Sequence, residues 1–260
     1  MKHIVLLLFA WLALGPIAAR ADSVGVVLIH GKQGSPDAPH LAYISQQIEH
    51  AGFLLDRPTM CWSRTRIFDR TIADCMADID ASIGRLKSRG AIAFVIVGHS
   101  LGGVGALYYG AQHDGLKGIA ALAPAPPPGV VRRPDVAASI QKAQTLIAGG
   151  HGDEFQSFTD SNSGPRGVVT IEVRATPNIF MSFNEMRGPA NLVNDATQQK
   201  APVLWVSGTR DSSQLPRSAA FDRVPANPLN RYLLIDAGHL DTPEAAANAV
   251  VAWLKDVTQH

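Results

Sequence analysis

Residues 98–102 read GHSLG and match the pattern G-x-S-x-G, with Ser100 at its centre. An apolar stretch, 92–97, leads into the motif, and a stretch of small and apolar residues, 104–113, follows it. A strand, a sharp turn and a helix in this order are the setting of a nucleophile elbow, which exposes the serine hydroxyl. The glycines around Ser100 leave room for such a turn. The sequence therefore predicts Ser100 as a nucleophile; the alternative is an unreactive serine in an ordinary glycine-rich turn.

A serine hydroxyl is a weak nucleophile until a base takes its proton, and His239 is the best candidate for that base. It follows the last apolar stretch, 232–235, after a short turn. Loops at the carboxyl ends of strands carry the ligand-facing residues of parallel sheets. The other histidines fall in the N-terminal segment, in other turns, in expected helices, in an irregular region or at the C-terminus. A histidine in a surface loop is the alternative interpretation of His239.

An imidazole base needs a carboxylate that orients it, and Asp211 is predicted to be that acid. It comes directly after an apolar stretch, 202–207, and a turn. Asp236 is the rival, but it stands only three residues before His239, at the end of the expected strand. We therefore expect Ser100, Asp211 and His239 to act together.

A negatively charged tetrahedral intermediate also needs hydrogen-bond donors. One is expected to be the backbone N–H of Leu101, the residue after the nucleophile. The other is expected from the turn that follows the first strand, where the backbone N–H of Lys32 is favoured and that of Gln33 is the next choice. An ordinary strand-ending turn is the alternative.

The elements that must position these residues alternate along the chain. The expected strands are 24–29, 53–56, 92–97, 116–122, 202–207 and 232–235, and the expected helices are 39–51, 71–88, 104–113 and 243–256. Strands that are apolar throughout, alternating with helices, indicate an α/β fold with a mostly parallel, doubly wound sheet that is covered on both faces. Between about 126 and 200 the alternation gives way to polar stretches and short helical patterns, which predicts a small inserted cap.

These features resemble the α/β-hydrolase superfamily over nearly all of the chain. The turn at His30, the elbow at Ser100 and the turns at Asp211 and His239 stand in the order of that superfamily. The sequence 62–64, Trp-Ser-Arg, further resembles small exported bacterial members. The resemblance implies the α/β-hydrolase fold and a serine hydrolase that acts on carboxylic esters through an acyl-enzyme. The pair of cysteines departs from the simplest members.

The first 21 residues are expected to be a signal peptide. A basic start is followed by an apolar run, 4–14, and by a small-x-small pattern at 19–21. The run is shorter than the ~20 residues of a membrane-spanning helix. Residues 22–260 are then expected to form a single domain that is periplasmic or secreted, with no integral membrane segment after cleavage. An uncleaved anchor is the alternative.

Export changes how Cys61 and Cys75 are interpreted. In an oxidising compartment, a pair of cysteines favours a disulfide, although two free thiols remain possible from the sequence alone. No further cysteine or histidine stands at ligand spacing, so no metal site is expected.

The charge balance and motifs restrict the partners. The formal net charge of +1 changes to −1 when Lys2 and Arg20 leave with the N-terminal segment. Such a balance does not favour nucleic acid, and no dinucleotide fingerprint is present, so no cofactor is expected. The oligomeric state is left open.

The substrate is expected to be a small or medium-sized soluble ester. Trp62, Phe180 and Phe183 are candidates for the pocket wall, with packing in the core as an equally good interpretation of each. An amidase, thioesterase or acyltransferase with the same site stays open, as does a ligand-binding protein that turns over slowly.

Overall fold

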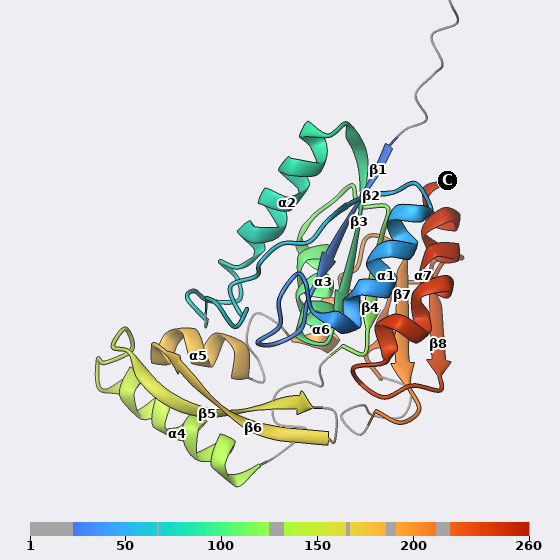
Figure 1. Cartoon of the computed structure of the whole chain (residues 1–260). Helices are drawn as coiled ribbons and strands as arrows, with labels where there is room; N and C mark the ends of the chain where they lie inside the picture. Colours follow the sequence, from blue (N-terminus) through green and yellow to red (C-terminus); the bar gives the residue numbers. More distant parts are fainter. Residues whose placement is uncertain are drawn as a thin grey trace, which may run out of the picture.

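Six parallel strands form the central sheet in a computed structural model of the 260-residue chain, in the order β2-β1-β3-β4-β7-β8 (Figure 1). The structure describes residues 23–66, 68–124, 133–164, 167–185, 191–211 and 219–259, so the expected signal peptide lies outside it. The strands are β1 (Ser23–Ile29), β2 (Leu54–Asp56), β3 (Ala91–His99), β4 (Gly118–Leu122), β7 (Val203–Gly208) and β8 (Arg231–Ile235). Each lies within two residues of its predicted range, and the predicted parallel α/β fold is confirmed.

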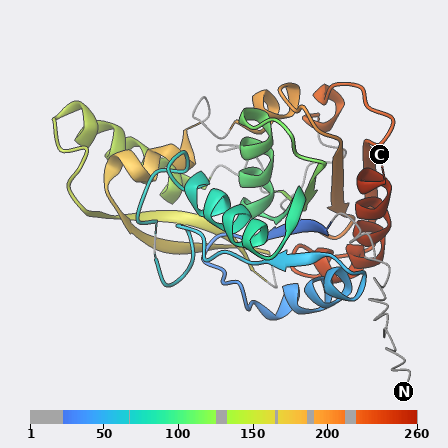
Figure 2. The same ribbon diagram turned by 90° about the horizontal axis from the view of Figure 1, so that it is seen from above.

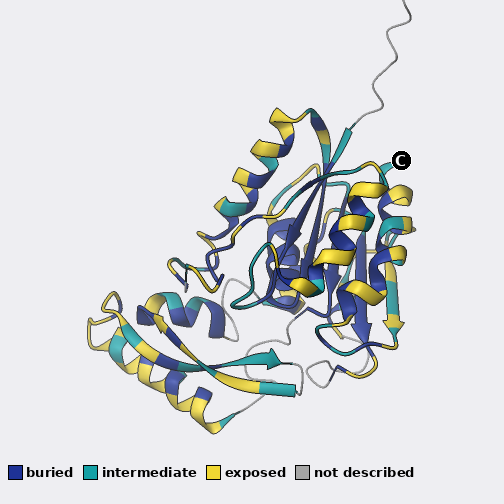
Figure 3. Cartoon of the chain, in the orientation of Figure 1, coloured by how far each residue is buried: buried dark blue, intermediate teal, exposed yellow. Residues whose placement is uncertain are grey.

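Helices cover both faces of this sheet. The pair α1 (Pro39–His50) and α7 (Thr242–Thr258) packs on one face, and α2 (Met76–Ser88), α3 (Leu101–Gln112) and α6 (Leu192–Thr197) lie on the other. Two apolar clusters, one on each face, bury the central strands (Figure 3). Strands β4 and β7 are buried along their whole length, which explains why they are apolar at every position.

The helix predicted at 71–88 begins only at Met76, because residues 72–75 form a turn. The Thr71 hydroxyl accepts a hydrogen bond from the Asp74 N–H and donates one to its carboxylate. Local bonds of this kind compete with helical bonding. The Ile72 N–H donates to the hydroxyl of Ser182, so it is also used outside the helix.

The insertion after β4 contains an antiparallel hairpin that the sequence analysis did not predict. It comprises α4 (Pro134–Ala148), β5 (Gln156–Gly164), β6 (Gly167–Ala175) and α5 (Pro177–Asn184). We call these four elements the cap. They lie beyond the carboxyl ends of the parallel strands in Figure 1, and α4 and α5 stand off to one side in Figure 2. The range predicted for the insertion also includes α6, which packs on α3, and residues 126–132, 165–166 and 186–190, which lie outside the described residues.

A short 3₁₀ helix, η1 (Phe221–Arg223), precedes β8. Within the described ranges, no helix combines the length and apolar character needed to cross a membrane. The same residues contain no group of three His, Cys, Asp or Glu side chains arranged to hold a metal ion.

Candidate active site

Ser100 occupies a strained turn between β3 and α3. Strand β3 runs to His99 and helix α3 begins at Leu101, so Ser100 alone joins them, with φ 57° and ψ −122°. A non-glycine residue with positive φ costs ~1–3 kcal/mol, which the surrounding structure must offset. The Ser100 N–H donates to the Leu122 carbonyl of β4 (2.9 Å), and this bond fixes the turn to the sheet. The geometry is that of the predicted strand, sharp turn and helix.

The glycines of the motif let the backbone segments of the elbow approach one another. A Cβ at Gly98 would lie 2.0 Å from the Gly102 carbonyl oxygen, and a Cβ at Gly102 would lie 2.5 Å from that of Ile29. The start of α3 therefore packs directly against β1. The N-terminal N–H groups of a helix have no partner within the helix, so this end of α3 favours negative charge beside Ser100.

The structure brings Ser100, His239 and Asp211 together. The Ser100 hydroxyl donates to His239 Nε2 (Oγ to Nε2, 2.9 Å), and His239 Nδ1 donates to the Asp211 carboxylate (2.6 Å). All three residues are buried. Asp211 follows β7, and His239 lies between β8 and α7, so both come from the carboxyl edge of the sheet. The chain of bonds has the geometry required for a hydroxyl, its base and an orienting acid.

Asp236, the rival acid, has a different environment. Its carboxylate accepts hydrogen bonds from the hydroxyl of Thr209 and pairs with Arg210 (3.0 Å), and its side chain is largely exposed. The Asp236 side chain therefore stabilises the turn before Asp211 at the protein surface.

Replacing each carboxylate by an amide separates the two candidates. Asp211→Asn is expected to lower kcat by about 10⁴-fold, because the amide no longer favours the tautomer in which Nε2 accepts the serine proton. Asp236→Asn, the matched control, is expected to change kcat less than threefold. Steady-state kinetics on a p-nitrophenyl ester measures both, and the reverse ranking would make Asp236 the acid.

His99 supports the loop that carries His239, a role that sequence reasoning missed. Its Nε2 donates to the backbone carbonyl of His239 (3.0 Å), and its ring lies next to those of His239 and His40. Burial, assisted by these two neighbouring imidazoles, lowers the pKa of His99 well below its ordinary value of 6.5. The only signal in the sequence was its place inside the elbow motif.

Burial also lowers the pKa of His30 and His40 below 6.5. In each case, and for His99, the unfolded chain takes up a proton at a higher pH than the folded protein. Stability is therefore complete above pH ~6.5 and is lost as the pH falls from there towards the lower folded pKa values, by at most ~1.4 kcal/mol per pH unit for each group.

Thermal unfolding between pH 8 and pH 5 tests this expectation. Tm is expected to fall steadily on the acid side, and His99→Gln is expected to make the fall shallower. His50→Gln is the control, because that side chain is exposed at the end of α1. A Tm that does not change between pH 7.5 and 5.5 would contradict the expectation.

The turn that was predicted to stabilise the oxyanion lies against Ser100. A Cβ at Gly31 would lie 3.0 Å from the Ser100 Cβ and 3.4 Å from its hydroxyl oxygen. The Gln33 N–H, the second choice for the donor, instead donates to the Trp62 carbonyl (2.9 Å). Among the described residues, the Lys32 N–H donates to no other group, and Leu101 opens helix α3. The roles of Lys32, Gln33 and Leu101 as oxyanion donors stay predictions.

Residues 60–64 hold this turn through a series of hydrogen bonds. The Trp62 indole N–H donates to the His30 carbonyl (3.0 Å), and the Met60 N–H donates to His30 Nε2 (3.2 Å). Farther along, the Arg64 N–H donates to the Gly34 carbonyl (3.2 Å). The position of residues 30–34 therefore depends on the position of this loop.

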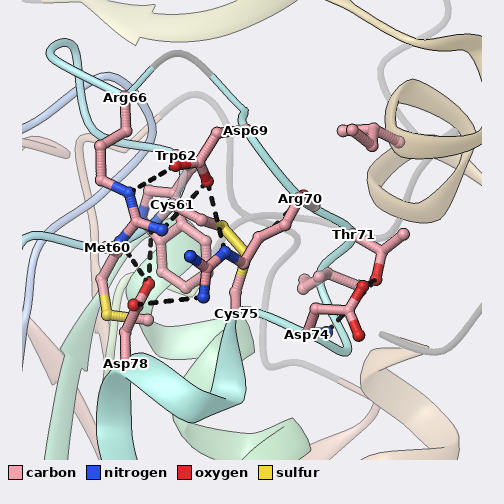
Figure 4. Close-up of a disulfide and its surroundings, with 12 residues drawn as sticks. Met60, Cys61, Trp62, Arg66, Asp69, Arg70, Thr71, Asp74, Cys75 and Asp78 are labelled. Atoms are coloured by element: carbon pink, nitrogen blue, oxygen red, sulfur yellow. Dashed lines mark hydrogen bonds and ion pairs between the residues drawn. A yellow bond between two sulfur atoms is a disulfide. The ribbon is translucent and has the colours of Figure 1, made fainter. Parts of the chain in front are cut away.

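A disulfide between Cys61 and Cys75 ties the same loop to the start of α2 (Figure 4). The Asp78 carboxylate accepts the Cys61 N–H (3.0 Å) and pairs with Arg66 (2.7 Å), which also pairs with Asp69 (2.8 Å). The disulfide, which the sequence favoured but left open, is therefore present. It restrains residues 60–64, the loop that holds residues 30–34.

Replacing both cysteines by alanine is expected to lower the free energy of unfolding by ~3 kcal/mol, as the chain-entropy model gives for a loop of about 15 residues. Urea unfolding of the double variant beside the oxidised wild type measures this difference. The oxidised wild type after treatment with dithiothreitol is the control and should approach the variant. Equal midpoints for all three samples would show that the disulfide does not stabilise the fold.

The predicted pocket residues are all buried in the apolar core. Trp62 and Phe183 meet edge to face (6.2 Å between ring centroids), and Phe180 stacks on Phe158 (4.3 Å). Trp62 and Phe180 are at most 1% exposed. Core packing accounts for these contacts, and contact of the three side chains with substrate stays a prediction.

The sequence profile of the Alpha/beta hydrolase family matches residues 26–252, which include every residue of this site. No curated protein matches the sequence.

Solved structures with the same fold include several lipid- and ester-related enzymes at low identity. Est1E from Butyrivibrio proteoclasticus with bound ferulic acid is 17% identical, with a TM-score of 0.64 over 92% of this chain and 91% of that one. A structure of the metagenome-derived lipolytic enzymes LipS and LipT gives 16% and 0.65 over 92% and 95%. A monoacylglycerol lipase from Paleococcus ferrophilus gives 21% and 0.64 over 90% and 94%. At these identities the likeness concerns the fold.

Proposed function

The chain belongs to the alpha/beta hydrolase family, and on that premise we propose that it is a serine hydrolase that cleaves a small or medium-sized carboxylic ester. The observation that carries the proposal is the chain of hydrogen bonds from Ser100 through His239 to Asp211, placed on a strained elbow. Such strain at a hydroxyl that contacts an imidazole is typical of an activated nucleophile.

In the proposed reaction, the Ser100 hydroxyl attacks the ester carbonyl carbon while His239 Nε2 takes its proton. Asp211 holds the imidazole in the required tautomer and stabilises the imidazolium. The backbone N–H groups of Leu101 and Lys32 donate to the oxyanion. His239 then gives the proton to the departing alcohol, which leaves an acyl group on Ser100. A water molecule, deprotonated by His239, releases the acid and regenerates the hydroxyl.

The choice of an ester is supported by the names of the structural neighbours. Est1E holds ferulic acid in its structure, and the other two are described as lipolytic enzymes or as a monoacylglycerol lipase. An ester is also a less demanding substrate than an amide, because its carbonyl is less stabilised by resonance and an alkoxide is a better leaving group than an amide anion. The buried position of Ser100 favours an acyl group that reaches into the protein.

A panel of substrates that differ in acyl group and leaving group tests this choice. p-Nitrophenyl acetate, butyrate and octanoate vary the acyl length, methyl ferulate presents an aromatic acid, and butyryl p-nitroanilide and butyryl-coenzyme A present an amide and a thioester. We expect kcat/KM for an ester to exceed that for the amide by at least 10²-fold, with a burst of p-nitrophenol as the acyl-enzyme forms. A higher kcat/KM for the amide or the thioester would show that the protein acts on that class of substrate instead of on esters. Binding without turnover would identify a binding protein.

We further infer that the mature protein acts outside the cytoplasm, in the periplasm or after secretion. The basic start, the short apolar run and the small-x-small pattern of residues 1–21 support export, as does the buried disulfide. N-terminal sequencing of the protein from a periplasmic fraction is expected to begin at residue 22. Recovery of the chain with residues 1–21 in the cytoplasm would contradict this localisation.

A further inference from the structure

Lys32, in the turn beside Ser100, is held by the cap. Its ammonium group pairs with the Asp160 carboxylate (2.6 Å) and donates to the Ser161 carbonyl (3.0 Å), both on strand β5. The Asp160 side chain is 2% exposed and that of Lys32 is 15% exposed, so the pair is largely removed from water. The two residues are 128 positions apart in the sequence, and the bond joins the cap to the central domain.

The backbone around Lys32 is fixed from both sides. Its carbonyl accepts a hydrogen bond from the Asn162 side chain (3.3 Å), also on β5. The N–H of the same peptide group, which belongs to Gln33, donates to the Trp62 carbonyl (2.9 Å). The peptide group between Lys32 and Gln33 is therefore held on one side by the cap and on the other by the loop of residues 60–64, which the disulfide restrains. The Lys32 N–H belongs to the preceding peptide group, and it is restrained because that group shares the Lys32 Cα with the one held in this way.

Asp160 is itself held in place by its surroundings. Its second carboxylate oxygen accepts the Ser161 N–H (2.7 Å), and the preceding residue, Thr159, donates its N–H to the Ser139 hydroxyl of α4 (2.8 Å). Two residues before Asp160, on the same buried face of β5, Phe158 stacks on Phe180 of α5. The Asp160 carboxylate is thus held in a packed part of the cap, and it restrains the position of the Lys32 ammonium group.

We propose that Asp160 is a positioning residue for the oxyanion donor, acting through Lys32 so that the cap sets the geometry of the hydrolytic site. This inference rests on the proposed function, because it assigns the Lys32 N–H to the tetrahedral intermediate. Loss of one oxyanion donor costs ~10²–10³-fold in kcat, which sets the upper limit for the effect of its displacement. Substrate binding before the reaction depends less on this donor, so the effect belongs in kcat.

Three variants of the mature protein test the inference. Asp160→Asn removes the charge and keeps the shape of the side chain. Lys32→Met combined with Asp160→Leu removes the pair without leaving a buried charge alone, which guards against a loss caused only by poor folding. Glu172→Gln is the matched control, because Glu172 lies on the same hairpin and its carboxylate contacts the exposed Ser157 hydroxyl.

Each variant is measured for Tm, for kcat and KM on p-nitrophenyl butyrate, and for inhibition by a trifluoromethyl ketone, which forms a tetrahedral adduct with the serine. We expect Asp160→Asn and the double variant to lower kcat by about 10–100-fold. KM is expected to stay within threefold, and the inhibition constant is expected to rise in parallel with the loss in kcat. Glu172→Gln is expected to match the wild type.

A folded Asp160→Asn variant with the kcat of the wild type would overturn the inference, as would a double variant whose kcat is restored. A loss seen only in KM would also overturn it, since that would assign Asp160 to substrate binding. These outcomes are distinct from failure of the proposed function, which would appear as a folded wild type and a folded Glu172→Gln variant that both leave the ester intact.

Discussion

Ser100→Ala is expected to lower ester hydrolysis by about 10⁶-fold, because alanine cannot form the acyl-enzyme that the proposed reaction places on Ser100. The fold is expected to survive, since the change removes one hydroxyl and its bond to His239 and keeps a non-glycine residue at the strained φ. Steady-state rates and Tm measured on the same preparation separate the two effects.

Ser45→Ala is the matched control. Ser45 is another buried serine, whose hydroxyl donates to the Leu41 carbonyl within α1, on the face of the sheet away from α3. It is expected to keep the kcat of the wild type. A Ser100→Ala variant that retains more than a hundredth of the activity would assign the nucleophile to another residue.

Gly98→Ala is expected to cause the largest loss of stability, more than ~4 kcal/mol, which is exceptional for a single substitution. The added methyl group would lie 2.0 Å from the Gly102 carbonyl oxygen and 2.7 Å from the Gly103 nitrogen. Both are backbone atoms at the start of α3, so they can move only if the elbow itself opens. The variant is therefore expected to be poorly soluble, or inactive where it is soluble.

The control is the same substitution at Gly84, on the exposed side of α2, where a Cβ would meet nothing within 4 Å. Gly84→Ala is expected to raise stability by ~1 kcal/mol, because alanine is the better helix former. Urea unfolding compares the two variants directly. Equal stability of Gly98→Ala and the wild type would contradict the elbow geometry.

The parallel sheet and the three residues brought together at its edge could be predicted because they depend on local and periodic signals. The strands are buried on both faces and are therefore apolar at nearly every position, as β7 illustrates. Ser100, Asp211 and His239 each follow such a strand directly or after a short turn, and the carboxyl ends of parallel strands meet at one edge. The arrangement thus follows once the strands are assigned.

The hairpin of the cap gave no comparable signal. Strand β5 is mostly polar, and only Phe158 and Asp160 among its side chains are buried, so neither an apolar run nor a regular alternation marks it. Its partner β6 is exposed over much of its length. These strands are specified by their pairing with each other and by their packing on α4 and α5, which depends on contacts distant in the sequence.

Contacts across long stretches of chain explain the other omissions. The bond from Lys32 to Asp160 and that from His99 to the His239 carbonyl span more than a hundred residues each. Trp62 was a candidate for the pocket wall, with packing in the core as an equally good interpretation. Nothing in the sequence indicated that its indole N–H donates to the His30 carbonyl, by which the residue supports the turn at residues 30–34.

Labelling of the mature wild type with a fluorophosphonate, followed by mass spectrometry of its peptides, tests the central claim most directly. The probe forms a covalent bond only with an activated serine, so it reports the nucleophile independently of the substrate. We predict one modified residue, Ser100, and no labelling after heat denaturation or in Ser100→Ala. A well-folded wild type that remains unlabelled, or a label on another serine, would contradict the assignment of Ser100, His239 and Asp211 as the hydrolytic site.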